Sequence, residues 1–244
     1  SKIFQFSCFN DLSWLVHGFS TRAFGNLGYG CGEAKKDVRK NREKFFEEFR
    51  ITGRDVVEPE QIHGNHVSVV GEKERGHLIL EADAILTVQK NVPLFARSAD
   101  CALILLVDTR QKVIGAVHAG WRGTVQKTVR IAVQHMEDHF GTKTSDVLAG
   151  IGPSIGPCCY EVGSEVEEAF QSAFPAYSKN LFLKKGNKLM LDLWSANKFQ
   201  LVEIGIPQKN IEISKVCTAD NTENFFSERK LGKTGRFGAV ISLL

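Results

Sequence analysis

Apolar residues follow two patterns along the chain: continuous runs of strand length, and the spacing typical of one face of a helix. These patterns predict the elements of the fold. Continuous apolar runs of strand length cover residues 102–107 and 113–117, as expected for strands buried on both faces. The turn-forming residues 108–111 between them predict a hairpin, whose two strands are antiparallel. The same reading predicts further strands at 66–70, 84–88, 92–96, 146–151, 211–213 and 237–243.

Helical spacing of apolar residues appears after Gly123. One face collects Val125, Val129, Ala132, Val133, Met136 and Phe140, which predicts a single helix that Gly141 ends. Further helices are predicted at 35–49, 161–170 and 191–203. Strands mixed with helices, with at least one hairpin, indicate an α/β or mixed α+β fold. We expect one domain over residues 1–244, with mixed and antiparallel sheets covered by helices.

Composition and charge narrow the class of protein. The 244 residues are 43% hydrophobic and 24% charged, which is ordinary for a soluble globular chain. The net charge of +3 is spread along the sequence, so no nucleic-acid surface is indicated. No stretch approaches the roughly 20 apolar residues of a membrane helix, and the first residues have no apolar core of signal-peptide length. We expect a cytoplasmic protein, a monomer or weak homodimer, without nucleic-acid or membrane partners.

The chain contains six cysteines. In a chain of this length without a signal-peptide pattern, reduced thiols are expected rather than disulfides. Cys158 and Cys159 are adjacent and lack the spacing of a zinc or redox motif, so we interpret them as buried structural thiols.

The strongest chemical signal comes from His63, Cys101 and His118, each at the edge of an apolar run. An antiparallel hairpin brings its two ends together, so Cys101 and His118 should be neighbours. His63 must join them from elsewhere in the fold. Two imidazoles and one thiolate form a three-ligand zinc set with one open position, as in catalytic zinc sites, and copper is the alternative metal.

Other interpretations of these residues remain open. A Cys101–His118 pair could be the nucleophile and base of a cysteine hydrolase, although the presence of His63 favours a metal. Asp100 could be a general base, a partner of a metal ligand, or a turn carboxylate. Arg122 lies in a glycine-rich turn before a helix, which suits either an anion-binding site or a plain turn. Further anion-binding candidates are Arg22 and Arg42.

Motifs along nearly the whole chain resemble the laccase-domain family, first described as polyphenol oxidases and now regarded as zinc-dependent purine nucleoside phosphorylases. The most specific strings are His118-Ala119-Gly120-Trp121-Arg122-Gly123 and Gly152-Pro153-Ser154-Ile155-Gly156-Pro157. Further motifs occur in the same order as in the family: Gly18-Phe19-Ser20-Thr21-Arg22, Asn26-Leu27-Gly28, Asn41-Arg42, Gln61-Ile62-His63-Gly64, Ala82-Asp83-Ala84, Ala99-Asp100-Cys101, Cys158-Cys159-Tyr160-Glu161-Val162, Cys217-Thr218 and Phe225-Phe226-Ser227.

This resemblance implies a set of functional expectations. It implies metal ligands at His63, Cys101 and His118, and phosphorolysis of adenosine, inosine and methylthioadenosine, with an adenosine deaminase activity. It also implies a fold distantly like that of a deamidating bacterial toxin with a Cys–His site. On this basis we expect catalysis by Asp100, Cys101 and His118, and contacts to nucleoside or phosphate from Arg22, Asn26, Arg42, Gln61 and Arg122. The chain departs from the family pattern in a shorter loop between Arg22 and Asn26, and in Glu228, where an aromatic residue is common.

Two further functions compete with the phosphorylase. A copper-dependent phenol oxidase of the laccase type needs several copper centres and many histidines, whereas this chain has seven histidines in all. A zinc-stabilised binding module would use the same three ligands and turn over no substrate.

Overall fold

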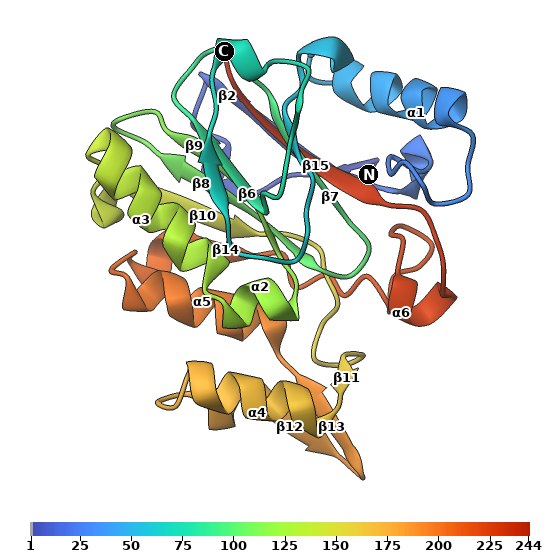
Figure 1. Ribbon diagram of the computed structural model, residues 1–244, viewed down its shortest axis with the longest axis vertical. Helices are drawn as coiled ribbons and strands as arrows, with labels where there is room; N and C mark the ends of the chain where they lie inside the picture. The colour runs from blue at the N-terminus through green and yellow to red at the C-terminus, as the bar shows by residue number, and fades with distance from the viewer. Residues whose placement is uncertain (1) are drawn as a thin grey trace.

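The computed structural model describes residues 2–244, and two stacked sheets form its centre (Figure 1). The larger sheet has the order β14-β10-β8-β9-β6-β4: Ile211–Ile213, Val147–Ile151, Ala102–Asp108, Ile114–Ala119, Ala84–Thr87 and Val67–Val69. The second has the order β1-β2-β15-β7: Ile3–Phe4, Leu15–Ser20, Phe237–Leu243 and Leu94–Ser98. Two smaller sheets complete the strands. One has the order β11 (Glu161–Val162), β13 (Lys188–Leu191), β12 (Phe182–Lys185). The other pairs β3 (Glu58–Pro59) with β5 (Leu78–Ile79).

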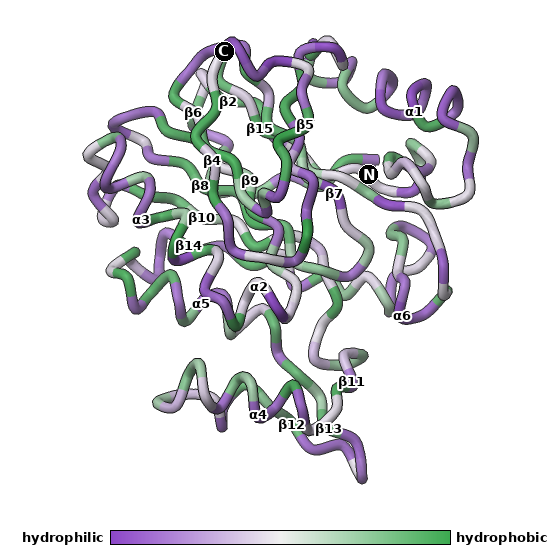
Figure 2. The backbone as a smooth tube through the Cα atoms, viewed as in Figure 1, coloured by the Kyte–Doolittle hydropathy of each residue, from purple (hydrophilic) through white to green (hydrophobic). Residues whose placement is uncertain are grey.

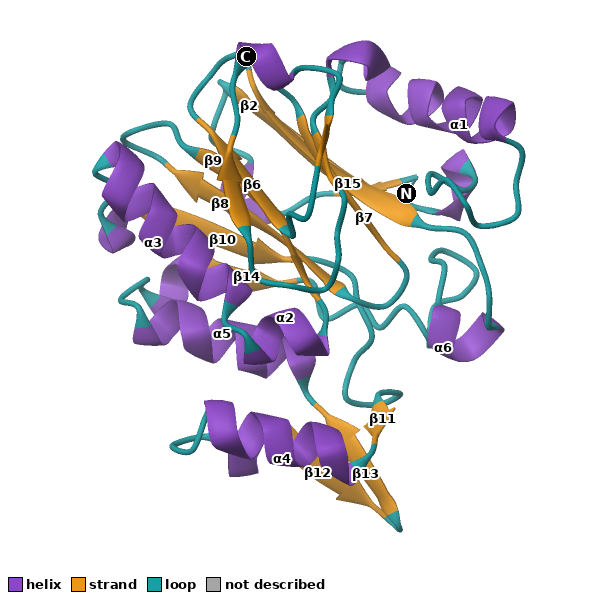
Figure 3. Cartoon of the chain, in the orientation of Figure 1, coloured by secondary structure: helices purple, strands orange, loops and turns teal. Residues whose placement is uncertain are grey.

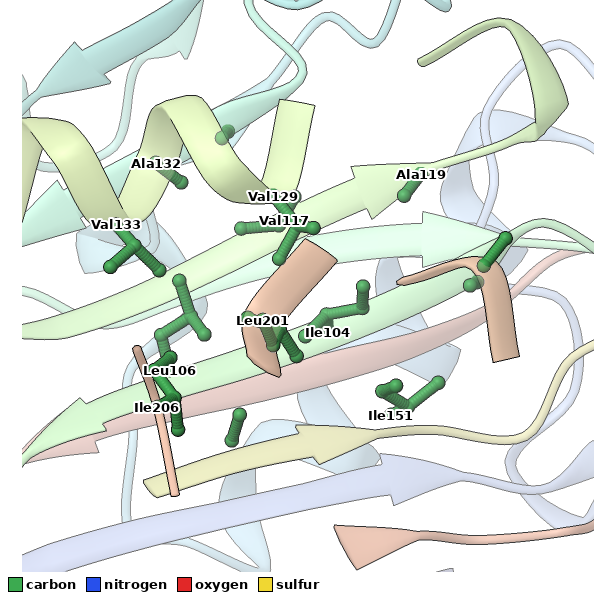
Figure 4. Packing of buried hydrophobic residues seen from close by; sticks show 14 of the residues in the cluster. Ile104, Leu106, Val117, Ala119, Val129, Ala132, Val133, Ile151, Leu201 and Ile206 are labelled. Atoms are coloured by element: carbon green, nitrogen blue, oxygen red, sulfur yellow. The ribbon is translucent and has the colours of Figure 1, made fainter. Parts of the chain in front are cut away.

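Strand β8 is buried on both faces, which explains why its sequence is apolar without alternation. Ile104 and Leu106 pack in the cluster under the helices, whereas Leu103 and Leu105 pack in the cluster between the two sheets. All residues of β8 are buried, because both faces of the strand are covered. Figure 3 shows the helices that cover the outer face of this sheet, which are α2 (Trp121–Val125), α3 (Thr128–Phe140) and α5 (Leu193–Glu203). Figure 4 shows residues of α3 and α5 packed on the strands.

Helix α1 (Lys35–Glu47) covers the outer face of the second sheet. Phe45 and Phe46 pack with Phe95 and Val240, and the rings of Phe46 and Phe95 meet edge to face at 5.1 Å. The core therefore has four layers, helix, sheet, sheet and helix. In Figure 2 the central strands are mostly hydrophobic and α1 is mostly hydrophilic. Helix α4 (Ser164–Ala173) and the β12–β13 hairpin project from this body, and α6 (Glu228–Leu231) lies beside it (Figure 1).

The structure corrects two helix predictions. The helix predicted through Val125 is broken, because Lys127 adopts a left-handed conformation (φ 63°) between α2 and α3. The hydroxyl of Thr128 lies 2.8 Å from the carbonyl of Gly123 and 2.9 Å from that of Gly64, which holds the break in place. The helix predicted at 161–170 begins only at Ser164, since its first two residues form β11 against β13.

The prediction that Cys158 and Cys159 are buried is wrong. Cys158 is exposed and Cys159 is half-buried, because the turn closed by the Cys159 N–H and the Gly156 carbonyl brings them to the surface. All six cysteines are free thiols. Over residues 2–244, no helix combines the length and apolarity that crossing a bilayer requires.

Candidate metal centre

The hairpin of β8 and β9 places two of the three expected ligands together. Ala102 pairs with Ala119 and Leu103 with His118 in an antiparallel register. Cys101, immediately before β8, therefore lies at the same end of the hairpin as His118, near the end of β9. The sequence-based prediction of this neighbourhood is confirmed.

His63 reaches the same end from the loop between β3 and β4. Gln61 and His63 both have left-handed backbone conformations, with φ of 59° and 63°. The loop is held by the carboxylate of Asp83, which accepts the backbone N–H groups of Ile62, His63 and Gly64 at 3.2, 3.1 and 2.7 Å. These bonds offset the cost of this backbone conformation and hold the loop that carries His63 in place.

The three side chains converge on one point. Their ligand atoms all lie within 4.8 Å of one another, and Sγ of Cys101 is 4.0 Å from Nε2 of His63. The two imidazole rings are nearly perpendicular, with centroids 4.9 Å apart. Nδ1 of His118 lies 2.8 Å from Oδ1 of Asp83, which leaves Nε2 of this histidine for the centre.

This donor set fits a zinc ion. Zinc takes nitrogen at about 2.0–2.1 Å and sulfur at about 2.3 Å, so neighbouring donors around it lie roughly 3.5 Å apart. Small side-chain movements would bring the three donors to that spacing. Gly120 is part of the fit, since a Cβ there would stand 2.8 Å from Sγ of Cys101 and 3.3 Å from Cδ2 of His63. A carboxylate behind a ligating histidine is the usual support of such sites.

The electrostatics of the centre favour a charged pair. Burial by itself raises the pKa of the Cys101 thiol, but His118 and His63 outweigh this effect and lower the pKa to about 6. Burial disfavours a charged His118, yet Cys101 and Asp83 raise its pKa to about 9. Both shifts have the same direction: each partner stabilises the charged form of the other. A deprotonated thiol is the form that binds metals, and it is also the form that acts as a nucleophile.

The centre opens into a cavity of about 700 Å³, a size typical of sites for small molecules. Among its polar lining residues are Gln61, His63, Arg97, Asp100, Tyr160 and Arg122. The apolar side chains of Trp121, Ile155 and Leu193 form other parts of the wall. The cavity wall therefore combines charged and polar groups with apolar side chains.

Four arginines line the cavity, and two of them are neutralised by carboxylates. Arg97 pairs with Glu58, and Arg236 pairs with Glu228. Arg122 and Arg229 have no ion pair with any residue of the described chain. Their guanidinium groups lie over aromatic rings, Arg122 over Trp121 and Arg229 over Tyr160. These two arginines are the cations best able to receive an anion.

Tyr160 lines the same cavity, and the guanidinium of Arg229 lies over its ring. Burial, Cys101 and Asp100 raise the pKa of its hydroxyl, while Arg229 and Arg122 oppose the rise. The hydroxyl therefore keeps its proton and can donate a hydrogen bond into the cavity.

Asp100 lines the cavity with its carboxylate fixed at both oxygens. Oδ1 accepts from the hydroxyl of Thr218 and Oδ2 from the backbone N–H of Arg229, both at 2.7 Å. Its own backbone is left-handed (φ 90°), and its carbonyl accepts the N–H of Ile155 at 2.8 Å. Asp100 thus joins three segments at the edge of the site.

The remaining residues expected at the site lie in different surroundings. Gln61 lines the cavity, but its amide is bonded to both backbone groups of Arg97. Arg22, Asn26 and Arg42 do not line this cavity. The Arg22 guanidinium packs on Phe226 and donates to the Thr222 carbonyl. The side-chain oxygen of Asn26 accepts the backbone N–H groups of Gly28 and Arg236. Arg42 forms a two-point ion pair with Glu58.

Sequence reasoning missed the part played by Asp83, Tyr160 and Arg229. A usable signal existed only for Asp83, a carboxylate within the apolar segment 82–86 that the fold buries completely. A buried carboxylate needs partners, and here they are the loop of His63 and the ring of His118. Tyr160 and Arg229 carry no such local signal, because they reach the site only through long-range packing.

The chain is similar to known proteins over most of its length. The sequence profile of a family described as multi-copper polyphenol oxidoreductase laccase matches residues 16–244. A purine nucleoside phosphorylase of Bacteroides thetaiotaomicron is 36% identical over 223 residues, covering 88% of this chain and 82% of that protein. The adenosine deaminase RL5, from an unknown prokaryotic organism, is 36% identical over 73% of this chain and 71% of its own. The crystal structure of YlmD from Geobacillus stearothermophilus superposes with a TM-score of 0.92 at 28% identity, covering 99% of this chain and 98% of that one.

Proposed function

Because the chain belongs to the multi-copper polyphenol oxidoreductase laccase family, whose relatives include named purine nucleoside phosphorylases, we propose that it cleaves purine nucleosides with phosphate. The proposed substrates are adenosine, inosine and methylthioadenosine, and the products are the free base and the corresponding ribose 1-phosphate. The observation that carries the proposal is the convergence of His63, Cys101 and His118 at a cavity that also holds two unpaired arginines. We further propose that residues 1–244 act as one unit of this family.

We propose zinc as the metal, held by His63, Cys101 and His118. A zinc ion with three protein ligands acts as a Lewis acid and lowers the pKa of water. Asp83 keeps His118 in the tautomer whose Nε2 faces the centre, and it holds the loop that carries His63. Copper remains the alternative metal for the same donors.

Phosphate binding is assigned to Arg122 and Arg229. Each presents a planar set of N–H donors, which suits the oxygens of a phosphate. Tyr160 lines the same cavity, and we propose that its hydroxyl donates a hydrogen bond to a substrate oxygen.

Asp100 is the proposed proton-transfer group. In phosphorolysis a phosphate oxygen bonds to C1′, the bond from C1′ to the purine nitrogen breaks, and the leaving purine takes up a proton. Asp100 can accept that proton from dihydrogen phosphate and pass it to the purine. The bonds from Thr218 and Arg229 fix the direction of its carboxylate and leave further lone pairs on the oxygens for this transfer.

Phosphate dependence tests the proposal directly. Purified, zinc-replete protein is incubated with inosine, with and without phosphate, and hypoxanthine is followed by chromatography. Hypoxanthine and ribose 1-phosphate are expected only with phosphate. No product from inosine, adenosine or methylthioadenosine would refute the phosphorylase.

Adenosine deamination is a second activity that we propose for the same centre. It is supported by the 36% identity to the adenosine deaminase RL5 over 188 residues. Conversion of adenosine to inosine in phosphate-free buffer, lost in a His63→Ala variant together with the metal, is the expected result. Loss of the metal without loss of deamination would separate this activity from the metal centre.

A cysteine hydrolase that uses Cys101 and His118 is the alternative to the phosphorylase and the deaminase, and an experiment can distinguish it from them. The lowered pKa of Cys101 beside His118 favours a nucleophilic thiolate in the metal-free protein. A His63→Ala variant that loses zinc but keeps full activity, combined with an inactive Cys101→Ser variant, would establish the hydrolase in place of the metalloenzyme.

A further inference from the structure

A second cluster of ligand atoms lies outside the centre just described. Cys158, Cys159 and Cys217 place their Sγ atoms within 4.8 Å of one another. The first two lie in the turn after β10, and the third lies in the segment that follows β14. None of these three residues lines the 700 Å³ cavity, and none is part of a disulfide.

We propose that Cys158, Cys159 and Cys217 form a second metal site, which takes a thiophilic d¹⁰ cation, Zn²⁺ or Cu⁺. Three sulfur atoms with no imidazole among them are the donor set that such ions select. Sulfur atoms around one zinc ion at about 2.3 Å lie roughly 3.8 Å apart, so the cluster closes on an ion with small side-chain movements.

The surroundings of the cluster are those of a site with one closed side and one open side. Cys217 is only 5% exposed, and its Sγ accepts the backbone N–H of Gly156 at 3.2 Å. Ile155, Ala219 and Trp194 pack around it and shield it from water. Cys158 is exposed, so an ion can enter from solvent on that side, and a fourth ligand can reach it there.

A cysteine binds a metal ion as the thiolate, so each thiol of the cluster that coordinates the ion releases its proton to solvent on binding.

The position of the cluster gives this ion a structural role. Ser154 pairs with Cys217, through the Ser154 N–H to the Val216 carbonyl and the Thr218 N–H to the Ser154 carbonyl, at 3.2 and 3.1 Å. Thr218 in turn donates to Asp100 at the cavity. An ion across the three sulfurs ties together the two segments that carry these bonds, and so holds the wall of the substrate cavity.

Cadmium binding tests the proposal without reference to activity. Reduced, chelator-treated protein is titrated with Cd²⁺, and both the bound ions and the thiolate-to-cadmium charge-transfer band are measured. The wild type is expected to bind two ions through four thiolates in total. Cys158→Ser should bind one ion and keep about one quarter of the band, whereas His63→Ala should bind one ion and keep about three quarters.

Cys8→Ser is the matched control, since this half-buried thiol is remote in sequence from both clusters; it should behave as the wild type. Cys158 is exposed, so its replacement leaves the core intact, and circular dichroism verifies the fold. One ion per wild-type chain, or an unchanged band in Cys158→Ser, would overturn the proposal. A disulfide among the three cysteines in protein isolated without oxygen would also overturn it.

Competition identifies the resident ion. Wild type and Cys158→Ser are loaded anaerobically with Zn²⁺ or Cu⁺ and challenged with a chelator selective for each ion. The ion that the wild type retains, and Cys158→Ser releases, is the one the site takes. Equal release of both ions from both proteins contradicts the assignment.

Discussion

Oδ1 of Asp83 lies 2.8 Å from Nδ1 of His118, and the same carboxylate accepts the backbone N–H of His63 at 3.1 Å. One carboxylate with no exposed surface therefore orients two of the three residues of the metal centre. Its pKa is lowered although burial opposes ionisation, because His118 and the backbone N–H groups of Gly64 and His63 stabilise the charge.

Asp83→Asn should weaken zinc binding. The amide keeps one acceptor oxygen, but its NH₂ group cannot accept the bonds that the second oxygen holds. Removing such a partner of a metal ligand reduces affinity by about 10–100-fold. Zinc affinity is measured by competition with a chelator. Asp55→Asn, which alters a partly exposed ion pair with Arg75, is the control; equal affinity of the two variants would contradict the role given to Asp83.

Gly120→Ala should disrupt the centre sterically. A Cβ at this position would lie 2.8 Å from Sγ of Cys101, closer than real contacts allow, so the thiol must move. We expect less than one zinc per chain by elemental analysis, and activity that falls in proportion. Gly53→Ala, where a Cβ would meet Phe46 at an ordinary 3.4 Å, should retain full zinc. A Gly120→Ala protein with full metal content and activity would show that this glycine is dispensable.

Arg229→Ala should raise KM for phosphate more than KM for the nucleoside. A hydrogen bond to a charged group contributes about 1.5–3 kcal/mol, so the expected increase is about 10–100-fold. Arg122→Ala should act in the same direction. Arg22→Ala is the matched control, since this side chain packs on Phe226 outside the cavity. KM for phosphate is obtained from initial rates at varied phosphate concentration. A larger increase in KM in Arg22→Ala than in Arg229→Ala would contradict the assignment of phosphate binding to Arg229.

His17 should make stability depend on pH away from the active site. It is 3% exposed, and its Nε2 accepts the backbone N–H of Phe6 at 2.9 Å, which requires the neutral ring. Burial lowers its pKa from 6.5 to about 4, although Glu212 opposes the shift. The unfolded chain takes up a proton below pH 6.5, so the stabilisation is complete above that pH. It is lost as the pH falls towards 4, by about 3 kcal/mol in total.

Urea unfolding of wild type and His17→Gln at pH 7.5 and pH 5 measures this effect. Glutamine can accept the Phe6 N–H without titrating, so the variant should lose less stability between the two pH values than the wild type. The same loss in both proteins would show that another group causes the dependence.

The hairpin illustrates what could be predicted from sequence. The apolar runs at 102–107 and 113–117, and the turn between them, are local signals, and an antiparallel pair must bring Cys101 close to His118. Helix α1 and strands β14 and β15 were likewise predicted from local periodicity. The break at Lys127 was not, because it depends on the contact between Thr128 and Gly64, a residue far away in the sequence.

The sequence by itself determined the mixed α/β class, the position of most strands and helices, and the residue types able to bind a metal, since side-chain chemistry and periodicity are local properties. Only the tertiary structure decided that His63 joins the hairpin, that Asp83 holds it there, and that Arg229 and Tyr160 face the cavity. It also brought Cys217 beside Cys158 and Cys159. These approaches join segments separated by tens of residues, and packing of the whole core selects them, which no local pattern encodes.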